Sequence, residues 1–184
     1  RNEYADFQAM RWADILRVDR DRVTPEGAVA MTGWLKRQFA SNRPYDAFAR
    51  EILIARGDTL AEGPAALYRV LEKPEALSRS LSQLFLGVRI ECAQCHHHPF
   101  EKWSQTDYFA FAGFFTGLKR KSLPGGNQAL LVTGGTDLKH ARSGEVVPAR
   151  ALGATRPADF TRVRDRREVL ADWMTSAENP FFAQ

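Results

Sequence analysis

The chain is poor in the features that define several classes of protein. It has only two cysteines among 184 residues, too few for a disulfide-stabilised scaffold. No run of residues approaches the roughly 18 consecutive apolar residues that a membrane span needs, so we expect no membrane span in this chain. Internal repeats and a regular alternation of strands with helices are also missing, which argues against a parallel sheet.

The residues that are present describe an ordinary globular protein. Apolar residues make up 44% and charged residues 26% of the chain, and this length suits one domain, or one domain and the edge of another. The net charge of +4 is spread through the chain, so we expect no nucleic-acid partner. The densest basic cluster, residues 162–167, is interrupted by Asp165 and is typical of the solvated start of a helix.

Apolar residues recur at helical spacing through most of the chain. They predict helices over about residues 4–18, 25–39, 44–55, 74–87, 105–115 and 164–175. Thr24, which precedes Pro25, and Ser104 are N-cap candidates. Two short apolar runs, 129–133 and 145–148, predict the two strands of a hairpin. We therefore expect a mainly α fold, an irregular helical domain with a small β-hairpin near its C-terminal third.

The spacing of the two cysteines is the sharpest signal in the chain. They stand directly before a histidine in the run Cys92-Ala93-Gln94-Cys95-His96, which spells C-x-x-C-H, the signature of covalent c-type haem attachment. If this run is helical, its positions i, i+3 and i+4 share one face. Cys92 and Cys95 can then bond the porphyrin edge while His96 ligates the iron. We expect one covalently bound haem c, held by these three residues.

Further iron ligands are less clearly marked. His98 precedes Pro99, which disfavours helical geometry, and His98 can have a structural hydrogen bond or a metal, propionate or supporting role. His140 is the only histidine far from the motif, so it is a candidate sixth ligand or an exposed loop residue. The methionines are the other candidates, although each lies on an apolar helical face where core packing competes: Met10, Met31 and Met174.

Covalent haem attachment of this kind requires export. We therefore expect a periplasmic or otherwise exported protein that exchanges electrons with a redox partner protein. The chain begins at Arg1 with neither Met nor a charged-then-apolar leader, and we interpret it as a mature or excised fragment.

The residues around the motif support a resemblance to a family. C-x-x-C-H is followed by His98-Pro99-Phe100-Glu101-Lys102-Trp103, of the form H-P-F-[DE]-x-W, and then by Asp107-Tyr108. With this signature, residues 84–109 resemble the planctomycete-type cytochrome c-like domain of unknown function. Residues 12–17 and 42–48 also match the pattern of that family.

The resemblance has consequences for domain organisation and for site residues. Residues 165–175 resemble the start of the uncharacterised domain that usually follows the cytochrome c-like one. The resemblance thus implies a cytochrome c-like helical domain over residues 1–160 and the opening helix of a truncated following domain over 161–184. It implies haem roles for Cys92, Cys95 and His96, and it assigns no role to the other motif positions.

Three other functions remain open from the sequence. A zinc-binding or interaction module would use Cys92, Cys95, His98 and His140 as ligands. A thiol–disulfide enzyme would use the C-x-x-C pair, although the strand–helix–strand context of such enzymes is missing. A haem enzyme would bind small ligands at an open iron position. Electron transfer by a c-type haem is the function that we expect.

Overall fold

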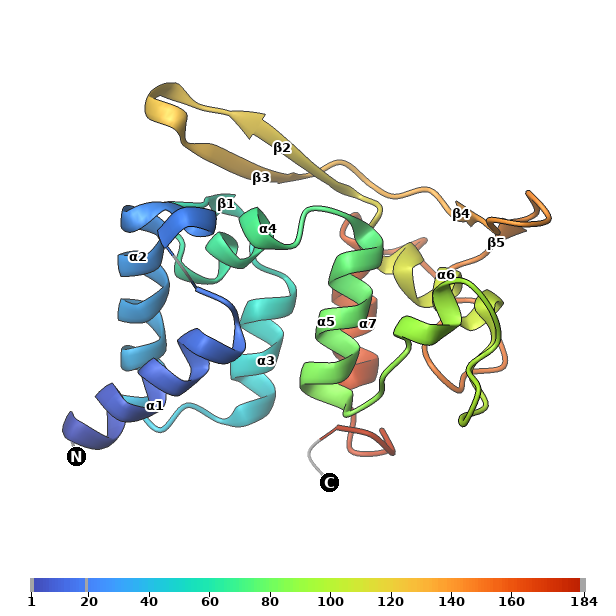
Figure 1. Ribbon diagram of the computed structural model, residues 1–184, viewed down its shortest axis with the longest axis horizontal. Coiled ribbons are helices and arrows are strands. Elements are labelled where there is room, and N and C mark those ends of the chain that lie inside the picture. The colour runs from blue at the N-terminus through green and yellow to red at the C-terminus, as the bar shows by residue number, and fades with distance from the viewer. Residues whose placement is uncertain (1, 19, 183–184) are drawn as a thin grey trace. The chain divides into compact units, whose positions relative to one another are not determined.

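The structure is a computed structural model that describes residues 2–18 and 20–182. The chain forms two compact units, one of residues 1–72 and 119–131 and the other of residues 73–118 and 132–184. Helices dominate both units and the strands are short and antiparallel, so the expected fold class is confirmed (Figure 1). Within the described ranges, no helix has the length and apolar character needed to cross a membrane.

The first unit is built from three helices that lie close to predicted positions and from two short helical elements that were not predicted. They are α1 (Asn2–Ile15), α2 (Arg20–Ala40), α3 (Tyr45–Leu53), the 3-10 turn η1 (Gly63–Ala66) and α4 (Leu67–Val70). Within α2, Thr24 has non-helical backbone angles, φ 67° and ψ 160°, and its Oγ1 accepts a hydrogen bond from the Gly27 N–H at 3.3 Å. Thr24 therefore caps a regular helix that begins at Pro25, as its side chain and the following proline predict.

The core of the first unit lies between α2, α3 and η1. The Trp34 and Phe48 rings stack with their centroids 5.2 Å apart. Gly63 approaches Trp34 so closely that an added Cβ would lie 2.5 Å from the Trp34 Cβ. The hydroxyl of buried Tyr68 donates to the backbone carbonyls of Ile52 and Leu53, which satisfies carbonyl groups at the end of α3.

A three-stranded antiparallel sheet has the order β1-β3-β2, with β1 (Gly57–Asp58), β2 (Leu118–Ser122) and β3 (Gln128–Val132). In the β1–β3 register, Gly57 lies opposite Leu130. A second, two-stranded sheet pairs β4 (Leu138–Lys139) with β5 (Val146–Val147).

The predicted pairing of the two apolar runs is wrong, although both runs contain strands. The run 129–133 pairs with β1 and β2, and the run 145–148 pairs with β4. Each run thus has a partner a few residues upstream in the chain. Closing a short turn costs less conformational entropy than closing the longer connection between the two runs.

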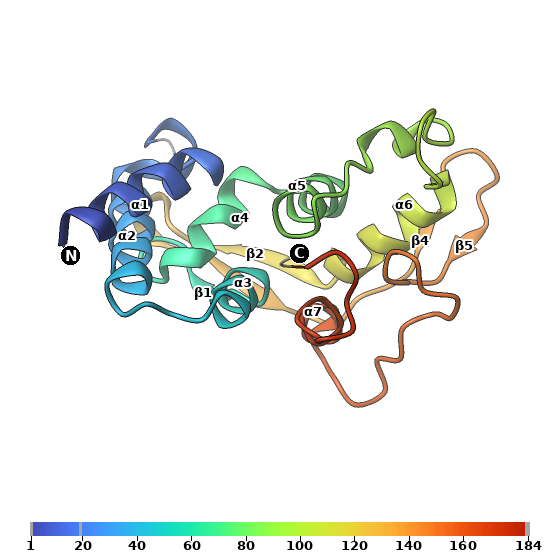
Figure 2. The same ribbon diagram turned by 90° about the horizontal axis from the view of Figure 1, so that it is seen from below.

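The second unit carries the cysteine motif. Its helical elements are α5 (Pro74–Leu86), the 3-10 turn η2 (Glu91–Gln94), α6 (Gln105–Ala112), the 3-10 turn η3 (Gly113–Phe115) and α7 (Arg166–Met174). α5 ends at Gly87, whose φ of 65° is the left-handed conformation that glycine adopts without a steric penalty. Figure 2 shows α5 and α7 nearly end-on. The aromatic side chains of η3 and α6 are buried between these elements: Tyr108, Phe109, Phe111, Phe114 and Phe115.

The basic cluster at residues 162–167 is only partly solvated, so that part of the expectation is wrong. Arg167 has no exposed surface, and its guanidinium donates to both carboxylate oxygens of Asp165, at 2.9 and 2.7 Å. α7, in which this arginine lies, packs against η3 and so belongs to the second unit. The division between a first domain at 1–160 and a following one at 161–184 stays a prediction.

Candidate functional site

The two cysteines lie at the ends of one 3-10 turn. η2 covers Glu91–Gln94, and Cys95 follows as its C-cap. Residues i and i+3 eclipse each other in a 3-10 helix, so this turn brings Cys92 and Cys95 to the same side. Both thiols are free and exposed. The run is thus a single 3-10 turn and not the continuous helix that was considered for it, and positions 92 and 95 still share one side.

The turn is held in place by polar side chains from the neighbouring helices. Gln105 at the start of α6 is buried, and its Nε2 donates to the Gln94 carbonyl at 2.8 Å. From α5, the Nη1 of Arg79 lies 3.2 Å from both Gln94 Oε1 and Glu91 Oε1. The buried Ala93 side chain fixes the inner side of the turn. These contacts orient the cysteines outward without involving their sulfur atoms.

The ring of His96 forms a hydrogen bond with the backbone. Its Nδ1 lies 2.6 Å from the carbonyl oxygen of His97. A carbonyl oxygen can only accept, so Nδ1 carries a proton, and in the neutral ring Nε2 then has the lone pair. A histidine that ligates a metal through one ring nitrogen commonly donates the other N–H to a backbone carbonyl. The exposed imidazole is therefore in the tautomer that can ligate iron through Nε2.

His98 has the opposite tautomer. Its Nδ1 accepts the backbone N–H groups of Phe100 at 3.2 Å and Glu101 at 2.9 Å. In the neutral ring the proton is then on Nε2, which leaves no lone pair for a metal. The backbone N–H of His98 also donates to the Trp103 carbonyl at 2.8 Å. The sequence leaves several roles open for His98, and the structure shows one of them, structural hydrogen bonding within the loop.

His140 resembles His98 rather than His96. It directly follows β4, and its Nδ1 accepts the backbone N–H groups of Arg142 and Ser143, both at 3.3 Å. Its ring lies 5.8 Å from the Phe109 ring, centroid to centroid. The proton of the neutral ring is again on Nε2, so this histidine stabilises the turn between β4 and β5.

The methionines have mixed environments. Met174 on α7 and Met31 on α2 are buried, whereas Met10 on α1 is 55% exposed. A buried thioether within a packed helical face is a core side chain. Met174, the methionine of the unit that holds the cysteines, thus has the environment of core packing rather than of a ligand.

The segment H-P-F-E-K-W forms a closed loop after the cysteine motif. Its last residue, Trp103, is buried and donates from Nε1 to Glu101 Oε2 at 2.7 Å. Its third residue, Phe100, has 93% of its surface exposed. Together with the bonds to His98, these contacts hold the loop so that one aromatic side chain is buried and the other projects into solvent.

The loop leads into α6 through a capping box. Ser104 Oγ accepts the Asp107 N–H at 3.1 Å, and Asp107 Oδ2 accepts the Ser104 N–H at 2.9 Å. The Arg150 Nη2 donates to Asp107 Oδ1 at 2.7 Å. Burial alone would raise the pKa of Asp107, but the hydrogen bonds from Ser104 and the charge of Arg150 outweigh it and hold the pKa below its usual value.

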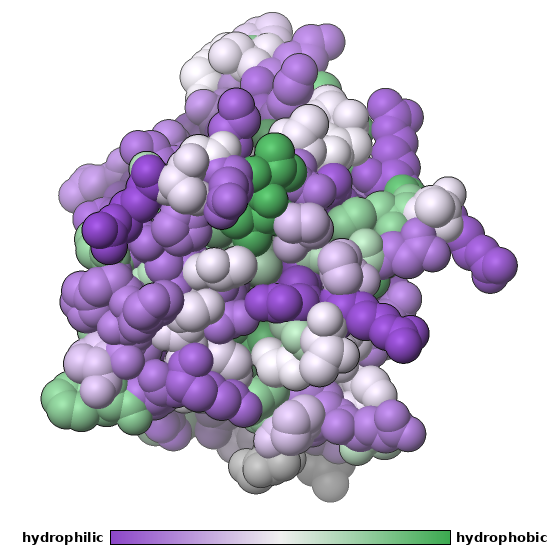
Figure 3. Space-filling model, turned by 90° about the vertical axis from the view of Figure 1, so that its right-hand side faces the viewer, coloured by the Kyte–Doolittle hydropathy of each residue, from purple (hydrophilic) through white to green (hydrophobic). Residues whose placement is uncertain are grey.

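The aromatic residues of α6 and η3 are core residues and not an open wall for a porphyrin. Phe111, Phe114 and Phe115 have at most 2% of their surface exposed. Burial raises the pKa of Tyr108 to about 12. The side of the second unit that carries α6, β4 and β5 has a largely hydrophilic surface with separate apolar patches (Figure 3). Phe100 is therefore the apolar side chain near the motif that is available to an external group.

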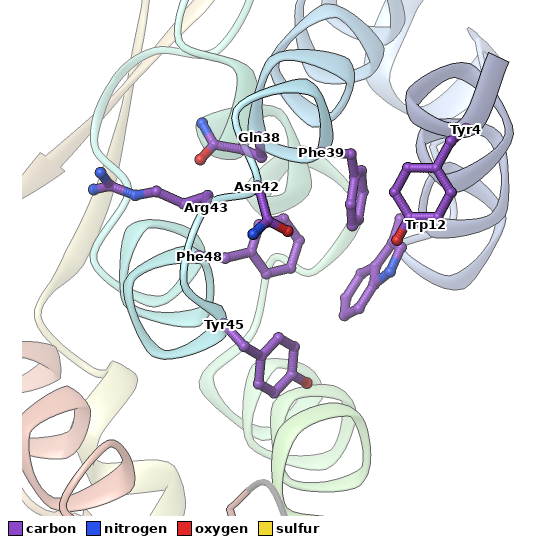
Figure 4. A pocket seen from close by; sticks show the side chains of 8 residues that line it. All are labelled: Tyr4, Trp12, Gln38, Phe39, Asn42, Arg43, Tyr45 and Phe48. Carbon is purple, nitrogen blue, oxygen red and sulfur yellow. The ribbon is translucent and has the colours of Figure 1, made fainter. Parts of the chain in front are cut away.

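A different set of motif residues meets in the first unit. A hollow of about 180 Å³ is lined by aromatic rings and by polar side chains: Tyr4, Trp12, Gln38, Phe39, Asn42, Arg43, Tyr45 and Phe48 (Figure 4). Arg43 pairs with Glu51, which also accepts the Trp34 Nε1–H at 3.3 Å. Residues 12 and 42–48, which carry the upstream part of the resemblance, thus build one aromatic cluster.

The side chains proposed as zinc ligands do not come together in the structure. In the part of the chain that the structure describes, no group of three or more His, Cys, Asp or Glu side chains is placed to share a metal ion. Cys92, Cys95, His98 and His140 therefore do not converge on a common point. The cysteines and His96, which covalent haem attachment uses in a different way, need no such cluster because the sulfur atoms bond the porphyrin and not the metal.

A match to a family model identifies the family to which the chain belongs. The family model described as PSCyt2, protein of unknown function (DUF1549), matches residues 1–120. The chain belongs to the PSCyt2 family. No curated protein and no solved structure gave a match. The PSCyt2 match includes the cysteine motif, the H-P-F-E-K-W loop and α6, whereas His140 and α7 lie beyond it.

Several residues of the site were not identified from the sequence. Arg79 and Gln105 hold η2, and Arg150 holds Asp107, although no motif of this PSCyt2 chain marks them. Only the Ser104-x-x-Asp107 capping box could have been recognised, because its spacing is fixed by the first helical turn.

Proposed function

We propose that this chain binds one haem c through Cys92, Cys95 and His96 and transfers electrons as part of an exported protein. The observation that carries the proposal is the hydrogen bond from His96 Nδ1 to the His97 carbonyl, beside two free and exposed thiols on one side of a 3-10 turn. This arrangement leaves the Nε2 lone pair for iron and both sulfur atoms for the porphyrin edge.

The roles of the residues follow from their chemistry. Each thiol adds across a vinyl group, the sulfur bonding one carbon and the proton going to the other, so that no oxidant is consumed. His96 supplies its Nε2 lone pair, and its N–H bond to the His97 carbonyl fixes the ring and raises its basicity. A bound haem supplies one-electron iron chemistry. Phe100, in the loop that follows, has an exposed ring that an attached haem could contact.

A haem-loading experiment tests the proposal. The chain is produced with a secretion signal in bacteria that have a c-type maturation system, and denatured protein is examined for haem that stays with the polypeptide. We expect one haem per chain, and none in the double variant Cys92→Ser, Cys95→Ser. Arg156→Ala, an exposed residue elsewhere in the same unit, is the matched control that should load normally.

A second candidate function, a haem with an open iron position, is favoured by a specific observation. His98 and His140 both accept backbone N–H groups at Nδ1, and Met174 is buried in the core. In these conformations none of these three side chains is therefore free to bind the iron as its sixth ligand. We expect the reduced holoprotein to bind carbon monoxide rapidly. A low-spin spectrum that carbon monoxide leaves unchanged would contradict the open position and leave electron transfer as the sole function.

A further inference from the structure

A basic hollow in the second unit is unrelated to the cysteine motif. It has a volume of about 540 Å³, and its lining includes Arg162, Arg164 and Arg166 together with Gly134 and Gly135. None of the described residues that line it is acidic. Three arginines within five positions of the chain thus line one concave surface.

Arg166 is the fixed member of the three. Its Nη1 donates to Asp137 Oδ1 at 2.7 Å and to the Gly113 carbonyl at 3.3 Å, and its guanidinium carbon lies 4.3 Å above the Phe160 ring. Gly135 leaves the space that this side chain needs, because a Cβ there would lie 2.6 Å from the Arg166 Cδ. One arginine of the hollow is therefore built into the fold, with much of its charge balanced by Asp137.

Arg162 and Arg164 are not balanced in this way. Both are exposed, and neither forms a hydrogen bond or an ion pair with another described residue. Hydrogen bonds from Thr161 and, to a smaller extent, the charge of Arg162 lower the pKa of Asp159, but the Arg162 and Asp159 side chains form no ion pair. The hollow therefore has two guanidinium groups whose donors are free for a ligand.

The glycine pair lines the same hollow. The N–H groups of Gly134 and Gly135 donate to no other described residue. Gly134 has a φ of 75°, a left-handed conformation. Successive backbone N–H groups at such a residue form a concave site that favours anions. The N-terminus of α7 is already capped by the Asp165 side chain.

We propose that this hollow binds a tetrahedral oxyanion, phosphate or sulfate, either free or as an ester group of a larger molecule. The planar guanidinium forks of Arg162 and Arg164 match the oxygen pairs of such an anion, and the N–H groups of the glycine pair supply shorter-range donors. The site is independent of haem binding, because no residue of the cysteine motif lines it.

Nuclear magnetic resonance of the ¹⁵N-labelled full chain tests the site. Inorganic phosphate, inorganic sulfate and phenyl phosphate are each titrated at constant ionic strength, with chloride as the balancing anion. We expect saturable shifts of the Gly134 and Gly135 amide signals with at least one of the three. Tighter binding of phenyl phosphate than of inorganic phosphate assigns the site to ester groups, and equal or weaker binding assigns it to the free anion.

Variants separate a site from general surface charge. Arg162→Ala and Arg164→Ala should each weaken binding roughly tenfold, the usual loss when a hydrogen bond to a charged group is removed. Both residues are exposed, so the remaining amide signals should stay in place and report an intact fold. Arg156→Ala, an exposed arginine outside the hollow, should bind like the unmodified chain. Linear, non-saturating shifts with all three anions, or equal weakening by Arg156→Ala, would overturn the proposal.

Discussion

The His96 Nδ1 atom lies 2.6 Å from the carbonyl oxygen of His97, the residue that follows it. This contact sets His96 apart from His98 and His140, whose Nδ1 atoms accept N–H groups instead. Three of the four histidines thus have their tautomers fixed by local backbone groups, and only one of these three has a free Nε2 lone pair. The C-x-x-C-H spacing marks His96 among them, whereas the roles of the Nδ1 atoms could not be predicted from the sequence.

The first prediction concerns these tautomers in the haem-loaded protein. His96→Ala should shift the Soret band and change the spin state, because the iron loses its ligand. His98→Ala and His140→Ala should leave the Soret band and the spin state unchanged. His98→Ala should also lower the free energy of unfolding by about 1 kcal/mol, because the loop loses the hydrogen bonds to His98. A spectral change in His98→Ala as large as that in His96→Ala would show that His98 is an iron ligand.

The second prediction concerns Asp107 and pH. Its pKa in the folded protein lies below the ordinary value of 3.8, so its carboxylate stabilises the fold above that value and the stabilisation is lost as pH falls through the lowered pKa. Asp107→Ala should lower the free energy of unfolding at pH 7 by about 1–2 kcal/mol, the range for a lost helix cap. Urea unfolding at several pH values should show the difference between the two proteins shrinking in acid. Glu178→Gln, at an exposed position, is the control; a pH-independent difference would contradict the role of Asp107.

The third prediction compares two glycines of the first unit. At Gly63 an added Cβ would lie 2.5 Å from the Trp34 Cβ and 2.9 Å from the Ala30 carbonyl, so Gly63→Ala should destabilise the unit by about 1–3 kcal/mol. At Gly33, within α2, the nearest atom would be the flexible end of Arg37 at 3.5 Å, so Gly33→Ala should stabilise by about 0.5–1 kcal/mol. Thermal unfolding should therefore shift in opposite directions, and a shift in the same direction would refute the close packing of η1 on α2.

The fourth prediction concerns the buried pair at the start of α7. Arg167→Ala leaves the Asp165 carboxylate buried with its guanidinium partner removed, and should lower the free energy of unfolding by about 3–5 kcal/mol. Arg164→Ala, three residues earlier and exposed, should change it by less than about 0.5 kcal/mol. Denaturant midpoints of the two variants provide the comparison. Equal midpoints would mean that Arg167 is not an integral part of the core.

The sequence predicted the helices well because their ends carry local signals. Thr24 with Pro25, Gly87 and Ser104 mark helix ends through interactions within one turn of the chain, and all three occur where expected. The strand partners could not be predicted in the same way. β1, β4 and β5 are two residues long, too short to show an alternating pattern, and β1 pairs with a strand about 70 positions away.

The sequence indicates which residues form the candidate site, but it does not predict the contacts that hold them in place. The C-x-x-C-H spacing marks Cys92, Cys95 and His96 as haem residues, which stays a prediction, and the structure places the two cysteines on one 3-10 turn. The hydrogen bonds that hold this turn come from Arg79 and Gln105, and the positions of these two residues depend on how α5 and α6 pack. The basic hollow likewise depends on a distant pair of glycines meeting the arginines before α7, which no local pattern encodes.

The most direct test of the central claim is the mass of the purified, denatured chain after maturation in a haem-competent host. We predict a mass increase equal to one haem, together with a Soret band that persists under denaturing conditions. Both should be lost in the double variant Cys92→Ser, Cys95→Ser. An unmodified mass in a host that loads a control cytochrome c to completion would contradict covalent haem binding by this chain.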